Sequence, residues 1–419
     1  MKKKVSLLLA LVMLFSVLTG CGKDAAVDTP DDASGEKGTL TIAYWVENYQ
    51  DWWDYVYEET GIKVEYESIP SADYASVMST RVKGGTAPDL FYNRNQGLAV
   101  AYAEAGAIVP FDDEMMAIVN ENVSEAGLVP STSTFVDGPI YGITDAYSFV
   151  NVLYYNADLF AENNIEVPTN MDEFIAVCDR FVELGITPFI NGASELNHFS
   201  HVSFVPQAIW YANNQMDYVK KLSTGESAFT DPEGVKAFQY YQDAVKYMAP
   251  DSIGLTHVDA WQVFADGGAA MLTGESWCIE QNYAVNPTSF QLGVTANPYN
   301  YEGEPHLGVG GKSTILHVNA NSENKDLAME YYKFWLTHLR EYAKMTGRPA
   351  PFKDDGTVFE WAPYADMYAE LSKLPGYPTQ GMPTVVDNDY KIFLQGIIAG
   401  TEDVSNLATL QEKLTAGLQ

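Results

Sequence analysis

Basic residues are scarce in this chain. Lysine and arginine together number 24 against 56 aspartates and glutamates, and the formal net charge at pH 7 is −32. Such an acidic surface repels the phosphates of nucleic acids and the headgroups of anionic lipids. We therefore expect no nucleic-acid partner and no adsorption to a membrane through basic side chains.

Cysteine is also rare, with three residues in 419, at Cys21, Cys178 and Cys278. Three cysteines cannot form a disulfide framework, although Cys178 and Cys278 could form a single bridge. Cys178 lies on the Phe174 and Phe181 side of an amphipathic segment. We expect both Cys178 and Cys278 to be buried thiols.

The motifs of several enzyme classes are missing. The sequence has no Gly-x-Ser-x-Gly, no His-Glu-x-x-His and no complete phosphate-binding loop, although residues 310–314 resemble the end of one. His198 and His201 have a spacing seen in metal sites but lack a third ligand at matching spacing. We expect no enzyme activity, no cofactor and no metal.

The first residues have the pattern of a secreted lipoprotein. Lys2, Lys3 and Lys4 precede an apolar segment over 5–18, which is followed by small residues and Cys21. The pattern predicts a signal peptide over 1–20, lipidation of Cys21, a flexible tether over 21–38 and an extracytoplasmic, lipid-anchored location. The alternative is an ordinary signal peptide with a chance cysteine. Beyond residue 20 no apolar run approaches the length of a membrane-spanning helix.

Strand and helix patterns alternate after the tether. Short apolar or alternating runs predict strands over 40–45, 62–67 and 88–92, and amphipathic runs predict helices over 49–59 and 71–83. This order predicts an open α/β sheet with largely parallel strands, which binds ligands beyond the carboxyl ends of its strands. Five polar or aromatic candidates follow the first and third strands: Trp45, Glu47, Asn48, Asn93 and Asn95.

The middle of the chain continues with further elements. We expect a turn and strand over 138–143, a strand over 150–156, and helices over 157–163 and 171–184. Thr169-Asn170 followed by two acidic residues predicts the start of the second helix, and Asp231-Pro232 predicts another start. A strand is expected over 314–318.

Five motifs in a fixed order resemble the family 1 extracellular solute-binding proteins of bacterial ABC importers, which include maltose-binding-protein-like sugar receptors. The matching stretches are Gly-Gly-Thr-Ala-Pro-Asp-Leu at 84–90, Tyr-Gly-Ile at 141–143 with Leu-Tyr-Tyr-Asn-Ala-Asp-Leu-Phe at 153–160, Pro-Thr-Asn-Met-Asp-Glu-Phe at 168–174, Gly-Gly-Ala-Ala-Met with Gly-Glu-Ser-Trp at 267–277, and the segment 321–336. Met171 departs from the pattern, where the family usually has tryptophan.

The resemblance implies a periplasmic-binding-protein-like fold of two α/β lobes joined by a hinge of three crossing segments, with solute held in the cleft between the lobes. One lobe would contain 39–146 and 307–347, and the other 147–306 and 348–419. It also implies a monomer that delivers its solute to ABC permease subunits.

The resemblance adds ligand-binding candidates in the second half of the chain. The family's tryptophan at the position of Trp277 stacks on sugar, and Glu275 lies two residues before it. Asp387 and Tyr390 fall in a late segment where the family places an aromatic ligand contact. The alternatives are a core position for Trp277, a solvated loop charge for Glu275, and a core helix position for Tyr390.

Sugars bind to aromatic rings through their apolar faces and to amides and carboxylates through their hydroxyls, so the candidates favour a carbohydrate ligand, most simply an oligosaccharide. Two alternatives stay open. The chain could bind another solute, such as a polyamine, or it could be a lipid-anchored surface glycosidase that uses a carboxylate pair.

Overall fold

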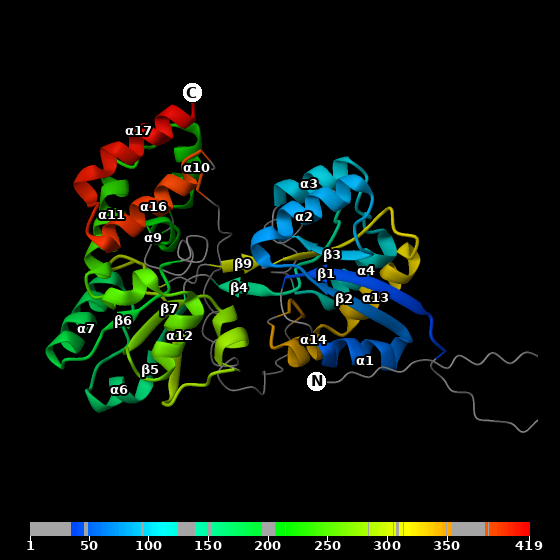
Figure 1. The fold of residues 1–419 in the computed structure, drawn as a ribbon, viewed down its shortest axis with the longest axis horizontal. Helices are drawn as coiled ribbons and strands as arrows, with labels where there is room; N and C mark the ends of the chain where they lie inside the picture. Colours follow the sequence, from blue (N-terminus) through cyan, green and yellow to red (C-terminus); the bar gives the residue numbers. More distant parts are fainter. Residues whose placement is uncertain are drawn as a thin grey trace, which may run out of the picture. The chain divides into compact units, whose positions relative to one another are not determined.

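The structure is a computed structural model, in which Glu36–Gln419 forms one compact unit (Figure 1). It describes residues 35–45, 49–93, 96–124, 139–149, 152–194, 206–213, 215–283, 285–304, 306, 310–312, 314–348, 350–353, 382–383 and 385–419. The predicted signal peptide, Cys21, Glu47, Asn48, Asn95, His198 and His201 lie outside the described residues.

The first sheet has four strands in the order β10-β3-β1-β2. Its strands are β1 (Gly38–Tyr44), β2 (Ile62–Ser68), β3 (Leu90–Asn93) and β10 (Ile315–Val318). Strand β1 runs parallel to β2 and β3, as the alternation of strands and helices predicted. Strand β10 comes from much later in the chain and joins β3 in antiparallel orientation.

Helices cover both faces of this sheet. They are α1 (Gln50–Thr60), α2 (Ser71–Gly84), α3 (Gln96–Glu104), α4 (Asp113–Asn122), α13 (Lys325–Thr337) and α14 (Leu339–Thr346). Side chains alternate along β1, so Ile42 packs in one core with Trp52 of α1 and Trp335 of α13. Ala43 faces the other side and packs with Tyr74 of α2. Figure 1 shows α2 and α3 on one side of the sheet and α1 and α14 on the other.

The second sheet has the order β6-β7-β5-β8. Its strands are β5 (Val152–Asn156), β6 (Phe189–Ile190), β7 (Met271–Gly274) and β8 (Leu292–Ala296). Strand β5 is antiparallel to both neighbours, and β6 is parallel to β7. The helices that follow or precede these strands are α6 (Ala157–Glu162), α7 (Met171–Glu183) and α12 (His257–Ala265). This sheet therefore mixes parallel and antiparallel pairs, whereas β1, β2 and β3 of the first sheet are all parallel.

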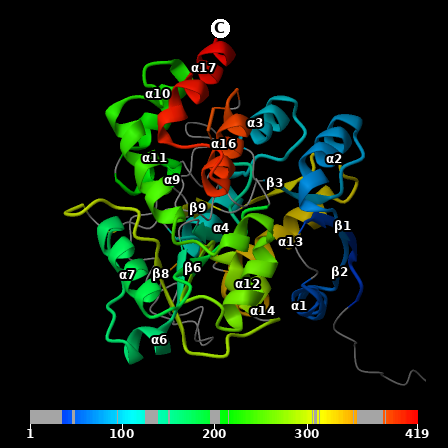
Figure 2. The same cartoon turned by 60° about the vertical axis from the view of Figure 1, so that its left-hand side comes forward.

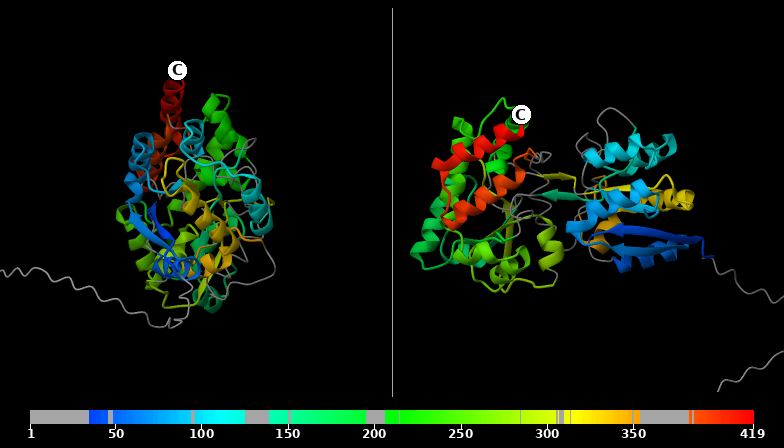
Figure 3. Two further views of the ribbon diagram at one scale, coloured as in Figure 1. Left: turned by 90° about the vertical axis from the view of Figure 1, so that its right-hand side faces the viewer. Right: turned by 45° about the horizontal axis from the view of Figure 1, so that its top comes forward.

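A helical layer built from distant parts of the sequence shares a core with this second sheet. It contains α9 (Pro206–Ala212), α10 (Met216–Thr224), α11 (Pro232–Val245), α16 (Asp387–Ala399) and α17 (Leu407–Gly417). The late helix α16 lies beside the green helix α11 in Figure 2, and the red helix α17 packs against α16. Figure 3 shows the same red and green helices from two further sides. Short 3₁₀ turns cover Pro250–Gly254 and Val404–Asn406, and a π-helical turn covers Ile279–Tyr283.

A two-stranded antiparallel ladder lies where the chain passes between the two sheets. Strand β4 (Tyr147–Phe149) pairs with β9 (Gly310–Lys312). Before β4, the isolated bridge from Thr144 to Ile315 ties the chain to β10. The expected strand over 138–143 is wrong in its described part, because residues 139–143 form no strand and the pairing begins only at Thr144.

Local end signals explain several helix boundaries. Gly61 adopts the left-handed conformation directly after α1, which is common for a glycine that ends a helix. The Asn170 side chain accepts the Glu173 backbone N–H at 3.0 Å and caps α7. Helix α11 does begin after Asp231, but this carboxylate accepts the N–H of Ala228 at 2.8 Å rather than one in the helix's first turn. The predicted start of α11 is confirmed, but the predicted capping of this helix by the Asp231 side chain is wrong.

Both expected buried thiols are confirmed. Cys178 and Cys278 are free and buried, and burial raises the pKa of the Cys178 thiol. In the described part of the chain, no helix combines the length and apolar character needed to cross a bilayer.

Candidate ligand-binding site

Trp45 and Asn93 lie at the same edge of the first sheet. Strands β1 and β3 are parallel, with Ala43 opposite Phe91. One residue further along, the rings of Tyr44 and Tyr92 stack with centroids 3.8 Å apart and planes 19° apart. Trp45 comes directly after Tyr44, and Asn93 ends β3. The structure therefore brings together two of the residues that the sequence predicted for a ligand site.

The Trp45 ring packs edge-to-face with two tyrosines. Its centroid lies 4.6 Å from that of Tyr44 at 70° and 4.7 Å from that of Tyr74 at 71°. Edge-to-face contacts of this kind fix the orientation of an aromatic ring. Trp45 itself is partly buried, and Asn93 is 8% exposed opposite Ile315 of β10. This edge thus presents one oriented indole beside one nearly buried amide.

Glu275 and Trp277 lie directly after β7 in the second sheet. The indole Nε1–H of Trp277 donates to a carboxylate oxygen of Glu275. The Trp277 ring also meets the His257 ring edge-to-face, with centroids 4.9 Å apart and planes 83° apart. The Tyr154 hydroxyl donates to the Glu275 backbone carbonyl at 2.7 Å, which holds the backbone directly after β7 in place. Trp277 is partly buried, whereas Glu275 is only 8% exposed.

This second pair has the chemistry of a polyol subsite. A partly buried indole offers an apolar face on which a ring of C–H groups can stack. A carboxylate has about four lone-pair positions, so Glu275 can accept the indole N–H and a ligand hydroxyl together. No proton transfer or nucleophile is required for such binding, because every interaction is a stacking contact or a hydrogen bond.

Tyr390 lies in the hydrophobic core. It is fully buried, its ring stacks against Phe229 with centroids 6.2 Å apart, and Phe238 meets it edge-to-face. Its hydroxyl accepts the backbone N–H of Gln207 at 3.2 Å, and burial raises the pKa of Tyr390. The position matches the alternative of a core helix residue rather than a ligand contact.

Asp387, the other late candidate, begins α16. Its carboxylate forms an ion pair with Lys391 one turn later, at 2.7 Å. A pair at this spacing supports the helix itself. The structure therefore gives Asp387 a local partner and leaves its predicted ligand contact as a prediction.

Three residues of these two edges were not predicted from the sequence. Tyr74 orients Trp45, whereas Tyr154 and His257 hold Glu275 and Trp277. Each acts across at least 20 residues of sequence, and no local motif signals such a contact. The sequence gives the types of these side chains, aromatic or imidazole, but not their contacts.

A separate groove of about 760 Å³ lies over α11 and the start of α7. It is lined by Asp172, Thr230, Pro232, Val235, Lys236, Gln239, Tyr240 and Asp243. None of the candidate residues borders it, and several of its polar groups pair with one another, as Tyr240 does with Asp172 and Gln239 with Asp243. The candidate residues at the strand ends therefore lie outside this groove. No metal-binding group of three or more His, Cys, Asp or Glu residues occurs in the part that the structure describes.

The chain matches known proteins along most of its length. The model of the family described as bacterial extracellular solute-binding protein matches residues 31–338. The Osmoprotective compounds-binding protein of Synechocystis sp. is 32% identical over 141 residues, which cover 33% of this chain and 32% of that protein. The Multiple sugar-binding protein of Streptococcus mutans is 23% identical over 377 residues, covering 84% and 83% of the two chains.

Among solved structures, a chitin oligosaccharide binding protein superimposes with a TM-score of 0.73 at 20% identity. The match covers 92% of this chain and all of that one. At this identity the likeness shows the fold alone, which is a two-lobed α/β fold. The matched stretch spans only about a third of the Synechocystis protein.

Proposed function

Because this chain belongs to the bacterial extracellular solute-binding proteins, we propose that it binds a carbohydrate outside the cytoplasm and delivers it to an ABC importer. The names of the Streptococcus mutans relative and of the chitin oligosaccharide binding protein support a sugar ligand. We further propose that the ligand is an oligosaccharide, that the permease subunits of the importer are the protein's partners, and that the protein acts as a monomer without catalysis.

The arrangement around Trp277 carries this proposal. The Trp277 ring is oriented on two sides, by the Glu275 carboxylate and the His257 ring, and it remains partly exposed. A fixed ring loses little entropy when a sugar stacks on it, and the neighbouring carboxylate can accept a sugar hydroxyl. Glu47, Asn48 and Asn95 stay predicted contacts outside the described residues.

A thermal-shift screen tests the ligand class. The mature protein is melted with a panel of mono- and oligosaccharides, and with spermidine and putrescine as the non-sugar arm. A sugar at 100 times its dissociation constant should add about 2.7 kcal/mol to the free energy of unfolding, visible as a rise in melting temperature. Stabilisation by the polyamines alone would contradict a carbohydrate ligand.

The same samples separate binding from hydrolysis. The stabilising oligosaccharide is incubated with the protein for hours and then analysed by chromatography. A binding protein returns the sugar intact and in stoichiometric amount. A rising quantity of shorter products would instead identify a glycosidase and overturn the proposed function.

The lipid anchor belongs to the same proposal. The apolar segment over 5–18 followed by Cys21 supports attachment of the mature chain to the cell membrane through a lipid on Cys21. Changing Cys21→Ser should release the protein from the membrane fraction or leave it at the size of the unprocessed form, as seen by immunoblot of fractionated cells. Cys178→Ser serves as the matched control, because that thiol is buried and should not affect anchoring. A Cys21→Ser protein that stays membrane-bound at its mature size would refute the anchor.

A further inference from the structure

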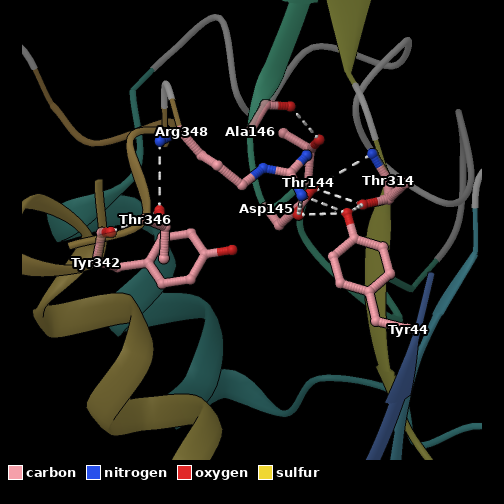
Figure 4. Close-up of polar contacts among 8 residues, drawn as sticks. All are labelled: Tyr44, Thr144, Asp145, Ala146, Thr314, Tyr342, Thr346 and Arg348. Carbon is pink, nitrogen blue, oxygen red and sulfur yellow. Dashed lines mark hydrogen bonds and ion pairs between the residues drawn. The ribbon is translucent and has the colours of Figure 1, made fainter. Parts of the chain in front are cut away.

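A buried ion pair joins Arg348 and Asp145 next to Tyr44, the last residue of β1. Their side chains lie 3.0 Å apart and are 6% and 0% exposed (Figure 4). Burial by itself would lower the pKa of Arg348, but the Asp145 carboxylate and the neighbouring tyrosines Tyr44, Tyr49 and Tyr342 together outweigh burial and hold the pKa well above its ordinary value. The guanidinium is therefore charged at every physiological pH.

The Tyr44 hydroxyl lies at the centre of this pair. It accepts a hydrogen bond from Arg348 Nη1 at 2.6 Å and donates to Asp145 Oδ2 at 2.9 Å. Thr314 Oγ1 lies 2.8 Å from the same hydroxyl and donates to Asp145 Oδ1 at 2.6 Å. Figure 4 shows these four side chains pointing toward one another from separate segments. We call Tyr44, Asp145, Thr314 and Arg348 the clamp cluster.

Three members of the clamp cluster come from segments that are far apart in the sequence. Asp145 lies just before β4, and Thr314 lies between β9 and β10. Arg348 follows Gly347, the left-handed residue that ends α14. Backbone bonds add to the connection, because Asp145 N–H donates to the Thr314 carbonyl at 2.9 Å. One ion pair thus ties together two segments that are more than 200 residues apart in the sequence.

The fourth member of the clamp cluster connects it to the candidate site. Tyr44 ends β1, directly before Trp45, and its ring packs edge-to-face with Trp45 and stacks on Tyr92. Tyr92 directly precedes Asn93. A shift of Tyr44 would therefore move both predicted ligand residues of the first sheet.

We propose that Arg348 and Asp145 are positioning residues for ligand binding, which act through the Tyr44 hydroxyl to hold Trp45 and Asn93 in place. This inference rests on the proposed function and extends it to residues that no sugar touches. Hydrogen bonds to charged groups are stronger than neutral ones, and all three polar partners of Tyr44 are buried, so the hydroxyl has one well-defined position.

The variant that tests this proposal most directly is Tyr44→Phe. It removes the hydroxyl but keeps the ring and both members of the ion pair, so the chain should still fold. Removing Arg348 or Asp145 alone would leave an unpaired buried charge and is unsuitable, because such variants often unfold. The matched control is Tyr241→Phe, which deletes an equally buried hydroxyl that donates to the Leu394 carbonyl in the core beside the second sheet.

Two measurements test the proposal. Hydrogen exchange of the ligand-free protein should be faster in the segments 42–45 and 90–93 of Tyr44→Phe, and unchanged there in Tyr241→Phe. Calorimetric titration with the sugar found by the thermal-shift screen should show roughly 3- to 10-fold weaker binding for Tyr44→Phe, and affinity within about twofold of wild type for Tyr241→Phe. A merely structural role would lower the melting temperature of both variants while leaving affinity and local exchange alone.

A double-mutant cycle identifies the route of the effect. If Tyr44 acts through Trp45, the affinity losses of Tyr44→Phe and Trp45→Ala should be smaller together than their sum. Additive losses, or unchanged exchange over 42–45 and 90–93 in Tyr44→Phe, would overturn the proposal. A wild-type protein that binds no sugar would instead refute the proposed function, and the exchange experiment would still decide the positioning role.

Discussion

Sugar affinity should depend most on Trp277, whose ring is partly exposed. Aromatic anchors dominate many binding sites, and their truncation often weakens binding by about 2 kcal/mol or more, which corresponds to roughly 30-fold in affinity. We expect Trp277→Ala to lower sugar affinity by this order while the far-UV spectrum stays native. Calorimetric titration and a thermal melt of the same variant measure the two effects.

Trp277→Phe is the matched control for this prediction. Phenylalanine keeps an aromatic face but loses the N–H that donates to Glu275. Its affinity should fall between those of wild type and Trp277→Ala. If Trp277 were only a core residue, Trp277→Ala would leave a cavity, reduce stability by about 3–5 kcal/mol and bind sugar normally per folded molecule. Affinity within twofold of wild type would remove this segment from the site.

Single residues also show how far sequence reasoning reaches. Tyr390, Phe393, Leu394 and Ile397 recur at helical spacing, and the structure buries all four against the neighbouring helices. The periodicity was visible in the sequence and favoured the core alternative, whereas only the family resemblance favoured a ligand contact. In this case the local physical pattern was the better guide to where the side chain points.

At the scale of elements, the first five of the folded part were predictable because each carries its own signals. Strands β1 and β2 show apolar runs or alternation, and glycines stand directly after α1 and α2. The parallel order then follows from the need to connect strands through helices. These signals are local, so one sequence suffices to read them.

The second sheet could not be predicted in the same way. Strand β6 has two residues and β7 has four, too few to show a period. Their pairing joins segments about 80 residues apart, and β10 pairs with β3 across more than 200 residues. Such pairing is decided by packing of the whole core rather than by local preference, which is also why Tyr154 and His257 were not predicted.

At the scale of the whole molecule, the clamp cluster shows what a sequence alone conceals. Its members Tyr44, Asp145, Thr314 and Arg348 come from four segments, and none of them belongs to a motif that carries the family resemblance. Only the fold shows that Asp145 is fully buried and is the partner of Arg348.

The last prediction concerns movement of the two lobes. The candidate residues belong to different sheets, with Trp45 and Asn93 after strands of the first and Glu275 and Trp277 after a strand of the second. If one sugar contacts both groups, it binds the closed state more tightly than the open state and shifts the population toward closure. Small-angle X-ray scattering should then show a smaller radius of gyration with a saturating oligosaccharide than without it.

Trp277→Ala provides the control for this experiment. At the sugar concentration that half-saturates the wild type, roughly 30-fold weaker binding should leave the variant almost wholly ligand-free and its radius of gyration unchanged. At a correspondingly higher concentration, the remaining contacts should restore part of the decrease. A wild-type radius that stays constant at full saturation would show that the ligand is held by one lobe alone, because a ligand with equal affinity for both states shifts nothing.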